Sequence, residues 1–145
     1  DDPERAMLGV TLESRPAYDF PVDVAIDSGT VGGPSAGLAF ALAILDRLTP
    51  GLLTGGERIA VTGTIELDGS VGRVGGVRQK TEAAIRAGAR VFLVPGDELA
   101  EAVTAADGRI EVRPVATLED ALDVLADLGG DPVPAPDAAA APTGG

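Results

Sequence analysis

The chain has 145 residues, a net charge of −12, 45% hydrophobic residues and 3% aromatic residues. This length fits one domain plus a short tail, and the acidity argues against nucleic-acid or anionic-membrane partners, because both need a basic surface. Histidine and cysteine are absent, so hydrolytic chemistry here must run without imidazole or thiol. No apolar run reaches the roughly 18 residues that a membrane span needs.

The first third of the chain predicts two strands and one helix. Residues 6–13 and 20–27 have strand character, the second through alternation of apolar and polar side chains. A turn over 28–34 leads into a helix over 35–48 that is apolar on nearly every face, which predicts burial all round. Thr49-Pro50-Gly51 ends this helix.

The remainder predicts an alternation of strands and helices, which is typical of an α/β fold built in layers. In chain order the predicted elements are a strand over 58–65, a hairpin turn at Asp68-Gly69 with a return over 70–74, a helix over 77–87 closed by Gly88, a buried strand over 90–94, a helix over 97–106, an edge strand over 109–113 and an amphipathic helix over 117–128 capped by Thr117. The Gly-, Pro- and Ala-rich residues 129–145 predict a disordered tail after a domain over 1–128.

Ser35 lies where the glycine-rich turn Gly32-Gly33-Pro34-Ser35-Ala36-Gly37 meets the start of a predicted helix. Backbone N–H groups at a helix start lack intrahelical partners and carry partial positive charge. A serine hydroxyl beside such donors can act as a nucleophile, and the donors can stabilise the oxyanion that forms. The alternative is that Ser35 only caps the helix.

Lys80, the one lysine, ends a second glycine-led stretch, Gly75-Gly76-Val77-Arg78-Gln79-Lys80, at the start of the 77–87 helix. A lysine acts as a base only where burial or positive potential favours its neutral amine. The helix start, Arg78 and the apolar residues 83–85 are expected to supply both. Arginine fills every other basic position and cannot act as a base, so Lys80 is the candidate base for Ser35. The alternative is a solvated surface lysine.

Four other polar residues lie near these two stretches. Thr62 and Thr64 flank Gly63 on the 58–65 strand, and either hydroxyl can orient the lysine amine, although β-branched residues are also usual in strands. Asp23 and Asp27 lie on the strand that enters the serine turn, where solvent-facing positions are the simpler interpretation.

These segments together resemble the proteolytic domain of Lon proteases. The resemblance rests on their order and spacing over roughly residues 20–105, and its motifs are Gly33-Pro34-Ser35-Ala36-Gly37, Thr62-Gly63-Thr64-Ile65, Gly75-Gly76-Val77-Arg78-Gln79-Lys80, Arg86-Ala87-Gly88 and the strand 91–95.

The resemblance implies a fold of the ribosomal protein S5 domain 2 type and serine endopeptidase activity on unfolded or extended polypeptides. It implies that Ser35 is the nucleophile and Lys80 the general base of a Ser-Lys dyad. Thr62 would support the lysine, and Gly33, Pro34 and Ala36 would shape the serine loop. No cofactor or metal is expected.

Two departures from the Lon pattern matter. Gly32 stands where Lon proteases usually have an aspartate, and no GxxxxGK[ST] pattern occurs, so the expected hydrolysis is ATP-independent. Residues 26–51 look closer to bacterial Lon-like proteases that carry a PDZ domain. That resemblance implies a missing N-terminal anchor and PDZ domain and a location outside the cytoplasm at the cell membrane, with a cytoplasmic location as the alternative. The resemblance to Lon-type domains in general implies a homo-oligomer such as a hexamer.

Three alternatives stay open from the sequence. A small-molecule kinase of the galactokinase type would use a similar loop to bind ATP phosphates, but it typically has a Ser-Ser pair where this chain has Ser35-Ala36. A catalytically idle, protease-like module would only bind partners. The isolated domain can also be folded but inactive until another domain or an oligomer orders its site.

Overall fold

A computed structural model describes residue 25 and residues 33–134, so the strands predicted over 6–13 and 20–27 lie, apart from residue 25, outside the described residues. The centre of the described part is a parallel sheet in the order β1-β4-β5. Its strands are β1 (Ile59–Val61), β4 (Val91–Pro95) and β5 (Glu111–Val115). In register, Ile59 lies beside Val91, which lies beside Glu111.

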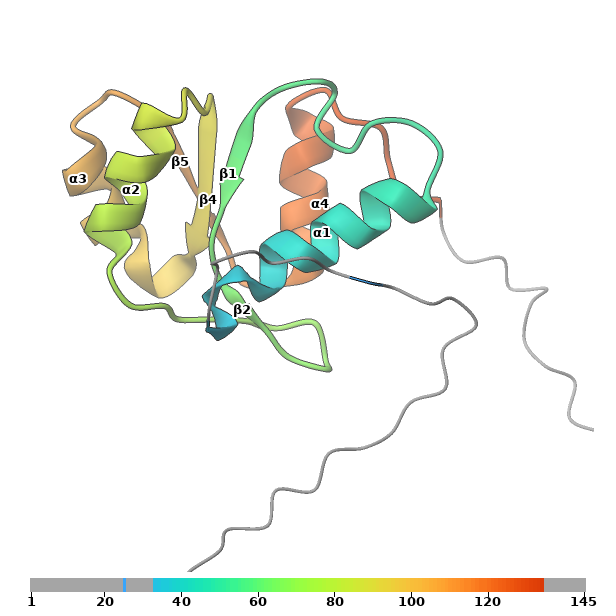
Figure 1. The fold of residues 1–145 in the computed structure, drawn as a ribbon, viewed down its shortest axis with the longest axis horizontal. Coiled ribbons are helices and arrows are strands. Elements are labelled where there is room, and N and C mark those ends of the chain that lie inside the picture. The colour runs from blue at the N-terminus through green and yellow to red at the C-terminus, as the bar shows by residue number, and fades with distance from the viewer. Residues whose placement is uncertain (1–24, 26–32, 135–145) are drawn as a thin grey trace, which may run out of the picture.

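Helices cover both faces of this sheet, so the domain has three layers (Figure 1). One face carries α1 (Gly37–Leu48) and α4 (Leu118–Asp127), and the other carries α2 (Val77–Arg86) and α3 (Leu99–Ala106). Two short 3₁₀ helices, η1 (Pro34–Ala36) and η2 (Gly96–Glu98), precede α1 and α3. In the chain, β1 is followed by a small antiparallel hairpin of β2 (Thr64–Ile65) and β3 (Val71–Gly72), which precedes α2. The α/β architecture expected from the sequence is confirmed.

The central strand β4 connects the two hydrophobic cores. Every residue of β4 is buried, and successive side chains point to opposite faces. Val91 and Leu93 join the α1–α4 core, whereas Phe92 and Val94 join the α2–α3 core. A parallel strand covered on both faces is expected to be continuously apolar, and the predicted strand over 90–94 is confirmed with a shift of one residue.

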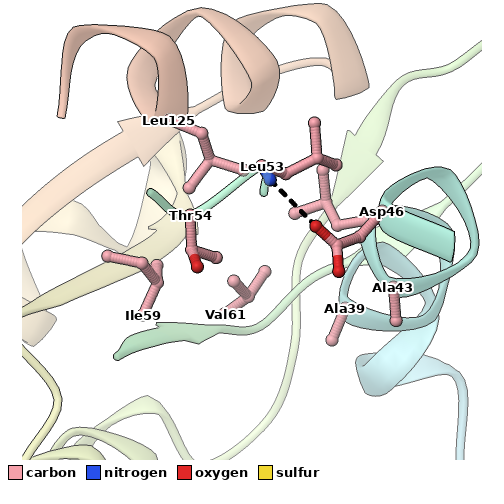
Figure 2. A pocket seen from close by; sticks show the side chains of 9 residues that line it. Ala39, Ala43, Asp46, Leu53, Thr54, Ile59, Val61 and Leu125 are labelled. Carbon is pink, nitrogen blue, oxygen red and sulfur yellow. Dashed lines mark hydrogen bonds between the residues drawn. The ribbon is translucent and has the colours of Figure 1, made fainter. Parts of the chain in front are cut away.

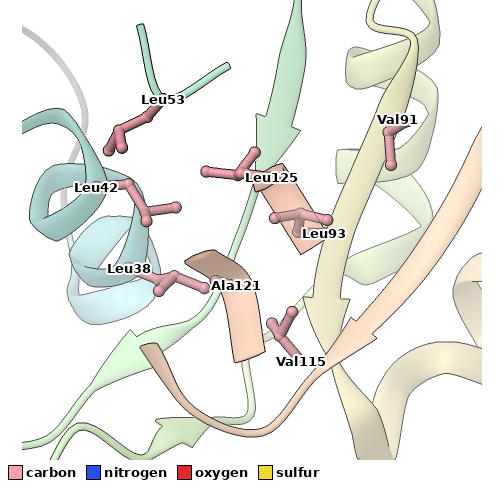
Figure 3. Close-up of a cluster of buried hydrophobic side chains, with 8 residues drawn as sticks. All are labelled: Leu38, Leu42, Leu53, Val91, Leu93, Val115, Ala121 and Leu125. Carbon is pink, nitrogen blue, oxygen red and sulfur yellow. The ribbon is translucent and has the colours of Figure 1, made fainter. Parts of the chain in front are cut away.

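The α1–α4 core gathers leucines from elements distant in the sequence (Figure 3). Leu38 and Leu42 of α1 pack with Leu93 of β4 and Leu125 of α4, all at most 7% exposed. Fully burying a leucine side chain contributes about 1.5–3 kcal/mol. This core therefore holds α1, whose first residues follow the serine turn, firmly against the sheet.

Local signals behave as the sequence predicts at the hairpin and at α4. Gly69 has a φ of 84°, and Asp68 Oδ1 accepts both the N–H and the hydroxyl of Ser70. Thr117 caps α4 in a capping box with Asp120, whose N–H donates to the Thr117 hydroxyl at 3.0 Å. Gly88, with a φ of 70°, follows α2 as a left-handed glycine.

Two expectations need correction. The helix α1 is not buried all round: Leu38 and Leu42 are buried, but Leu48 is 55% exposed, because the described elements cover one face of α1. The predicted strand over 58–65 is two strands, since the chain leaves the sheet at 62–63. Past residue 128, the Asp131 carboxylate accepts the Leu52 N–H at 2.9 Å, and the Asp131 N–H donates to the Leu52 carbonyl.

No helix within the described ranges is long and apolar enough to cross a membrane.

Candidate active site

The serine turn is shaped by backbone conformations that its residue types favour. Gly33 has a φ of 86°, which glycine adopts without strain. Pro34 then begins η1, where a missing N–H costs nothing. Gly37 lets α1 approach the hairpin, because a Cβ there would lie 3.0 Å from Ile65 Cγ2 and 3.2 Å from the Ile65 amide nitrogen. Ser35 and Ala36 are thus presented at the start of a helix.

The main chain of Ser35 is fixed to the end of β1. Its carbonyl accepts the Gly63 N–H at 3.0 Å and the Thr62 hydroxyl at 3.2 Å. In return, the Leu38 N–H donates to the Gly63 carbonyl at 3.1 Å, and the Thr62 N–H donates to the Leu93 carbonyl at 3.0 Å. These hydrogen bonds fix the position of the serine turn relative to the central sheet.

Lys80 is the fourth residue of α2, which begins after Gly76 in the left-handed conformation. The Lys80 N–H donates to the Gly76 carbonyl at 3.1 Å, and its side chain turns back so that Nζ donates to the Gly75 carbonyl at 2.8 Å. The residue is half-buried. The glycine pair therefore both starts the helix and supplies an acceptor for the amine.

A pocket of about 380 Å³ brings the two predicted catalytic residues together. Ser35, Lys80 and Thr62 are the polar residues in its lining. The rest of the wall is apolar and comes from η1, β1, α2 and β4, namely Ala36, Ala60, Val61, Ala83, Ala84, Ala87 and Phe92. Within the described part of the chain, no hydrogen bond joins the Ser35 and Lys80 side chains.

The Thr62 hydroxyl donates to the Ser35 carbonyl, and its support of the lysine stays a prediction. Thr64 lies outside the lining, next to Gly72, where an added Cβ would lie 2.3 Å from the Thr64 hydroxyl oxygen. Of the loop residues predicted to support the site, Ala36 lines the pocket, whereas Gly33 and Pro34 shape the turn from outside it. Asp23 and Asp27 lie outside the described residues.

Glu98 was not singled out from the sequence. Its carboxylate is only 5% exposed, and its oxygens accept the N–H of Val74, the residue directly before the Gly75-Gly76 pair. Among the described residues, the two carboxyl groups with shifted pKa values lie outside the pocket. Hydrogen bonds from Ser70 lower the pKa of Asp68, and the Arg109 guanidinium lowers the pKa of Glu82.

A second pocket, of about 210 Å³, lies between α1, β1 and α4 (Figure 2). Its wall is mostly apolar, and its charged member, Asp46, accepts the Leu53 N–H at 2.8 Å. Thr54 supplies a hydroxyl, but no basic side chain accompanies it in the lining. In the described ranges no three acidic, histidine or cysteine side chains gather as metal ligands. The pocket with Ser35 and Lys80 is therefore the better candidate site.

Comparison with known proteins gives one consistent answer. The family model that matches residues 9–127 is the Lon protease (S16) C-terminal proteolytic domain. Lon protease 1 of Herpetosiphon aurantiacus is 39% identical over 98 residues, which cover 68% of this chain and 12% of that protein. Lon protease of Xanthomonas oryzae pv. oryzae is 31% identical over 120 residues, covering 81% and 14%. An archaeal Lon protease of Archaeoglobus fulgidus is 36% identical over 101 residues, covering 68% and 16%. The chain thus spans less than a fifth of the length of these relatives.

Proposed function

Because this chain belongs to the family of Lon protease (S16) C-terminal proteolytic domains, we propose that it hydrolyses peptide bonds with Ser35 as the nucleophile and Lys80 as its general base. The observation that carries the proposal is the shared pocket: two residues from separate motifs, one on η1 and one on α2, line the same cavity. A serine–lysine pair is also a chemically sufficient nucleophile and base in a chain without histidine or cysteine.

In the proposed reaction, the neutral amine of Lys80 takes the proton of the Ser35 hydroxyl as its oxygen attacks the peptide carbonyl. The two groups must first approach to about 2.6–3.2 Å. The backbone N–H groups of Ser35 and Ala36, at the start of η1, would stabilise the oxyanion. The ammonium of Lys80 then protonates the leaving amine, and water, deprotonated by Lys80, hydrolyses the acyl-enzyme.

The bond from Lys80 Nζ to the Gly75 carbonyl supports this role. An amine donates such a bond in its neutral form as well as in its charged form, so its lone pair remains free to accept a proton. Ala83, Ala84 and Phe92 form an apolar wall of the same pocket, next to the amine.

Hydrolysis of an unstructured substrate such as fluorescently labelled casein tests the proposal. We expect Ser35→Ala and Lys80→Arg to abolish turnover while leaving the thermal transition unchanged, because arginine keeps the charge but cannot act as a base. Arg86→Lys, on the last turn of the same helix, is the matched control and should keep full activity. Turnover retained by Lys80→Arg would refute the dyad, and casein binding without turnover in the wild type would favour a binding module.

We propose further, from the family resemblance, that substrates are unfolded or extended polypeptides and that hydrolysis does not consume ATP. The expected result is an equal casein turnover rate with and without Mg-ATP. From the resemblance to PDZ-bearing bacterial proteases we also propose that the protein is anchored on the outer side of the cell membrane. From the resemblance to Lon-type domains in general we propose that it forms a homo-oligomer. Light scattering of the purified chain and protease accessibility in spheroplasts test these two points, and a monomer or a protected protein would count against them.

A further inference from the structure

Among the described residues, Glu98 is the one charged residue that is buried, with 5% of its surface exposed. Its two carboxylate oxygens lie 3.2 and 3.1 Å from the Val74 amide nitrogen, so both share one backbone donor. Burying a carboxylate is costly unless it is hydrogen-bonded. The bond from Val74 therefore offsets part of the cost of burying this side chain.

The position of Glu98 allows another arrangement that the chain does not use. Glu98 is the N-cap residue of α3, where a carboxylate is favoured by the helix dipole and could accept N–H groups of α3 itself. Its side chain makes no such capping bond. It extends instead to the segment that connects β3 to α2.

That segment contains the acceptor of the lysine amine. Val74 is followed by Gly75, whose carbonyl accepts the Lys80 Nζ–H at 2.8 Å, and then by Gly76 in the left-handed conformation. Two glycines in succession leave the backbone with many accessible conformations, and apart from its chain neighbours no described residue has an atom within 4 Å of where a Gly75 Cβ would be. Side-chain packing at Gly75 therefore does not fix this segment, and the bond from the Val74 N–H to Glu98 anchors it just before the two glycines.

We infer that Glu98 is a positioning residue: by holding the Val74 amide it orients the Gly75 carbonyl, and through that carbonyl it places the Lys80 amine in the pocket with Ser35. This inference rests on the proposed function for its catalytic consequence, but the placement of the amine is a separate physical claim. Misplacing a reacting group by about 1 Å can reduce a rate by on the order of 10²-fold.

The test compares Glu98→Gln with Glu98→Met. Both variants remove the charge and keep an unbranched side chain of similar length, but only glutamine keeps an oxygen that can accept the Val74 N–H. Since Lys80 is the only lysine, protein grown with ¹³Cε-labelled lysine gives one lysine signal, which reports the environment of this amine directly. We expect Glu98→Met to move that signal toward the free-lysine position, and Glu98→Gln to keep it near the wild type.

Casein hydrolysis supplies the second readout. We expect kcat to fall about 10–100-fold in Glu98→Met, with KM unchanged, and to stay within about threefold of wild type in Glu98→Gln. Glu101→Ala removes an exposed carboxylate from the first turn of the same helix and should change neither readout. If Glu98→Met does not fold, Glu98→Asp keeps the charge but withdraws the oxygens by one methylene, and the same signal shift is expected.

An unchanged Lys80 signal in a folded Glu98→Met or Glu98→Asp variant would overturn the inference. Equal shifts in Glu98→Gln and Glu98→Met would also overturn it, because charge rather than hydrogen bonding would then be responsible. If the lysine signal shifts as expected in the Glu98 variants but the wild-type protein has no peptidase activity, the placement of the amine by Glu98 is supported and the proposed function is refuted. The two failures are therefore distinguishable.

Discussion

Replacing Thr62 by valine removes one hydroxyl at nearly constant shape and tests what this buried residue does. Thr62 is 4% exposed, and its hydroxyl donates to the Ser35 carbonyl at 3.2 Å, which is long for an O–H···O bond. The carbonyl keeps a second donor, the Gly63 N–H at 3.0 Å, so it is not left unpaired. A net hydrogen bond contributes about 0.5–1.5 kcal/mol, and we expect a loss near the lower end, about 0.5–1 kcal/mol.

The assay is thermal unfolding of Thr62→Val, with Thr64→Val as the control from outside the pocket. A loss of this size corresponds to a fall in Tm of about 2–6 °C for a domain of this length. The ¹³Cε signal of Lys80 should not move, because Thr62 bonds to Ser35 and not to the amine. A shifted lysine signal with an unchanged Tm would refute this reasoning and restore Thr62 as the residue that orients the amine.

Three further predictions concern stability. Leu93→Ala, at 0% exposure, should lower the free energy of unfolding by about 2–5 kcal/mol in urea titrations, whereas Leu67→Ala, at 83% exposure, should change it by less than about 0.5 kcal/mol; similar losses at both sites would contradict the described core. Thr117→Ala should cost about 1 kcal/mol through loss of the α4 cap, with casein turnover unchanged. Because donors from Ser70 lower the pKa of Asp68 in the folded state, Asp68 stabilises the fold above its unfolded pKa of about 3.9, and this contribution is lost as pH falls through the folded pKa. Asp68→Asn should therefore flatten the acid limb of the stability profile, and an unaltered limb would count against that bond.

Sequence patterns predicted the elements whose signals are local. The Asp68-Gly69 turn, the Thr117 cap and the apolar strand 91–95 each follow from neighbouring residues, and all three are present. The exposure of α1 was misjudged, because the apolar character of a helix does not show how many neighbours cover it.

Features that depend on tertiary contacts could not be predicted in the same way. The break of the 58–65 strand at Gly63 arises where its N–H turns to the Ser35 carbonyl, a contact with a distant segment. The partner of the Thr62 hydroxyl and the burial of Glu98 are likewise set by segments far away in the sequence. The shared pocket of Ser35 and Lys80 agrees with the pairing that the motifs suggested, while the catalytic roles of both residues stay predictions.

The consecutive amides at the end of β1 have a consequence for how this domain tolerates changes in length. The Thr62 N–H faces β4 and the Gly63 N–H faces the serine turn, so neighbouring peptide units serve opposite sides of one strand. One residue inserted or deleted within 59–63 would exchange these directions, since strand geometry alternates with every residue. It would detach Ser35 from the sheet without altering the serine turn or the Gly75-Gly76 stretch. The hairpin that follows is tied from two sides as well, because the Glu66 N–H donates to the Ser70 carbonyl at 2.9 Å and the Gly69 carbonyl accepts the Leu118 N–H of α4 at 2.8 Å.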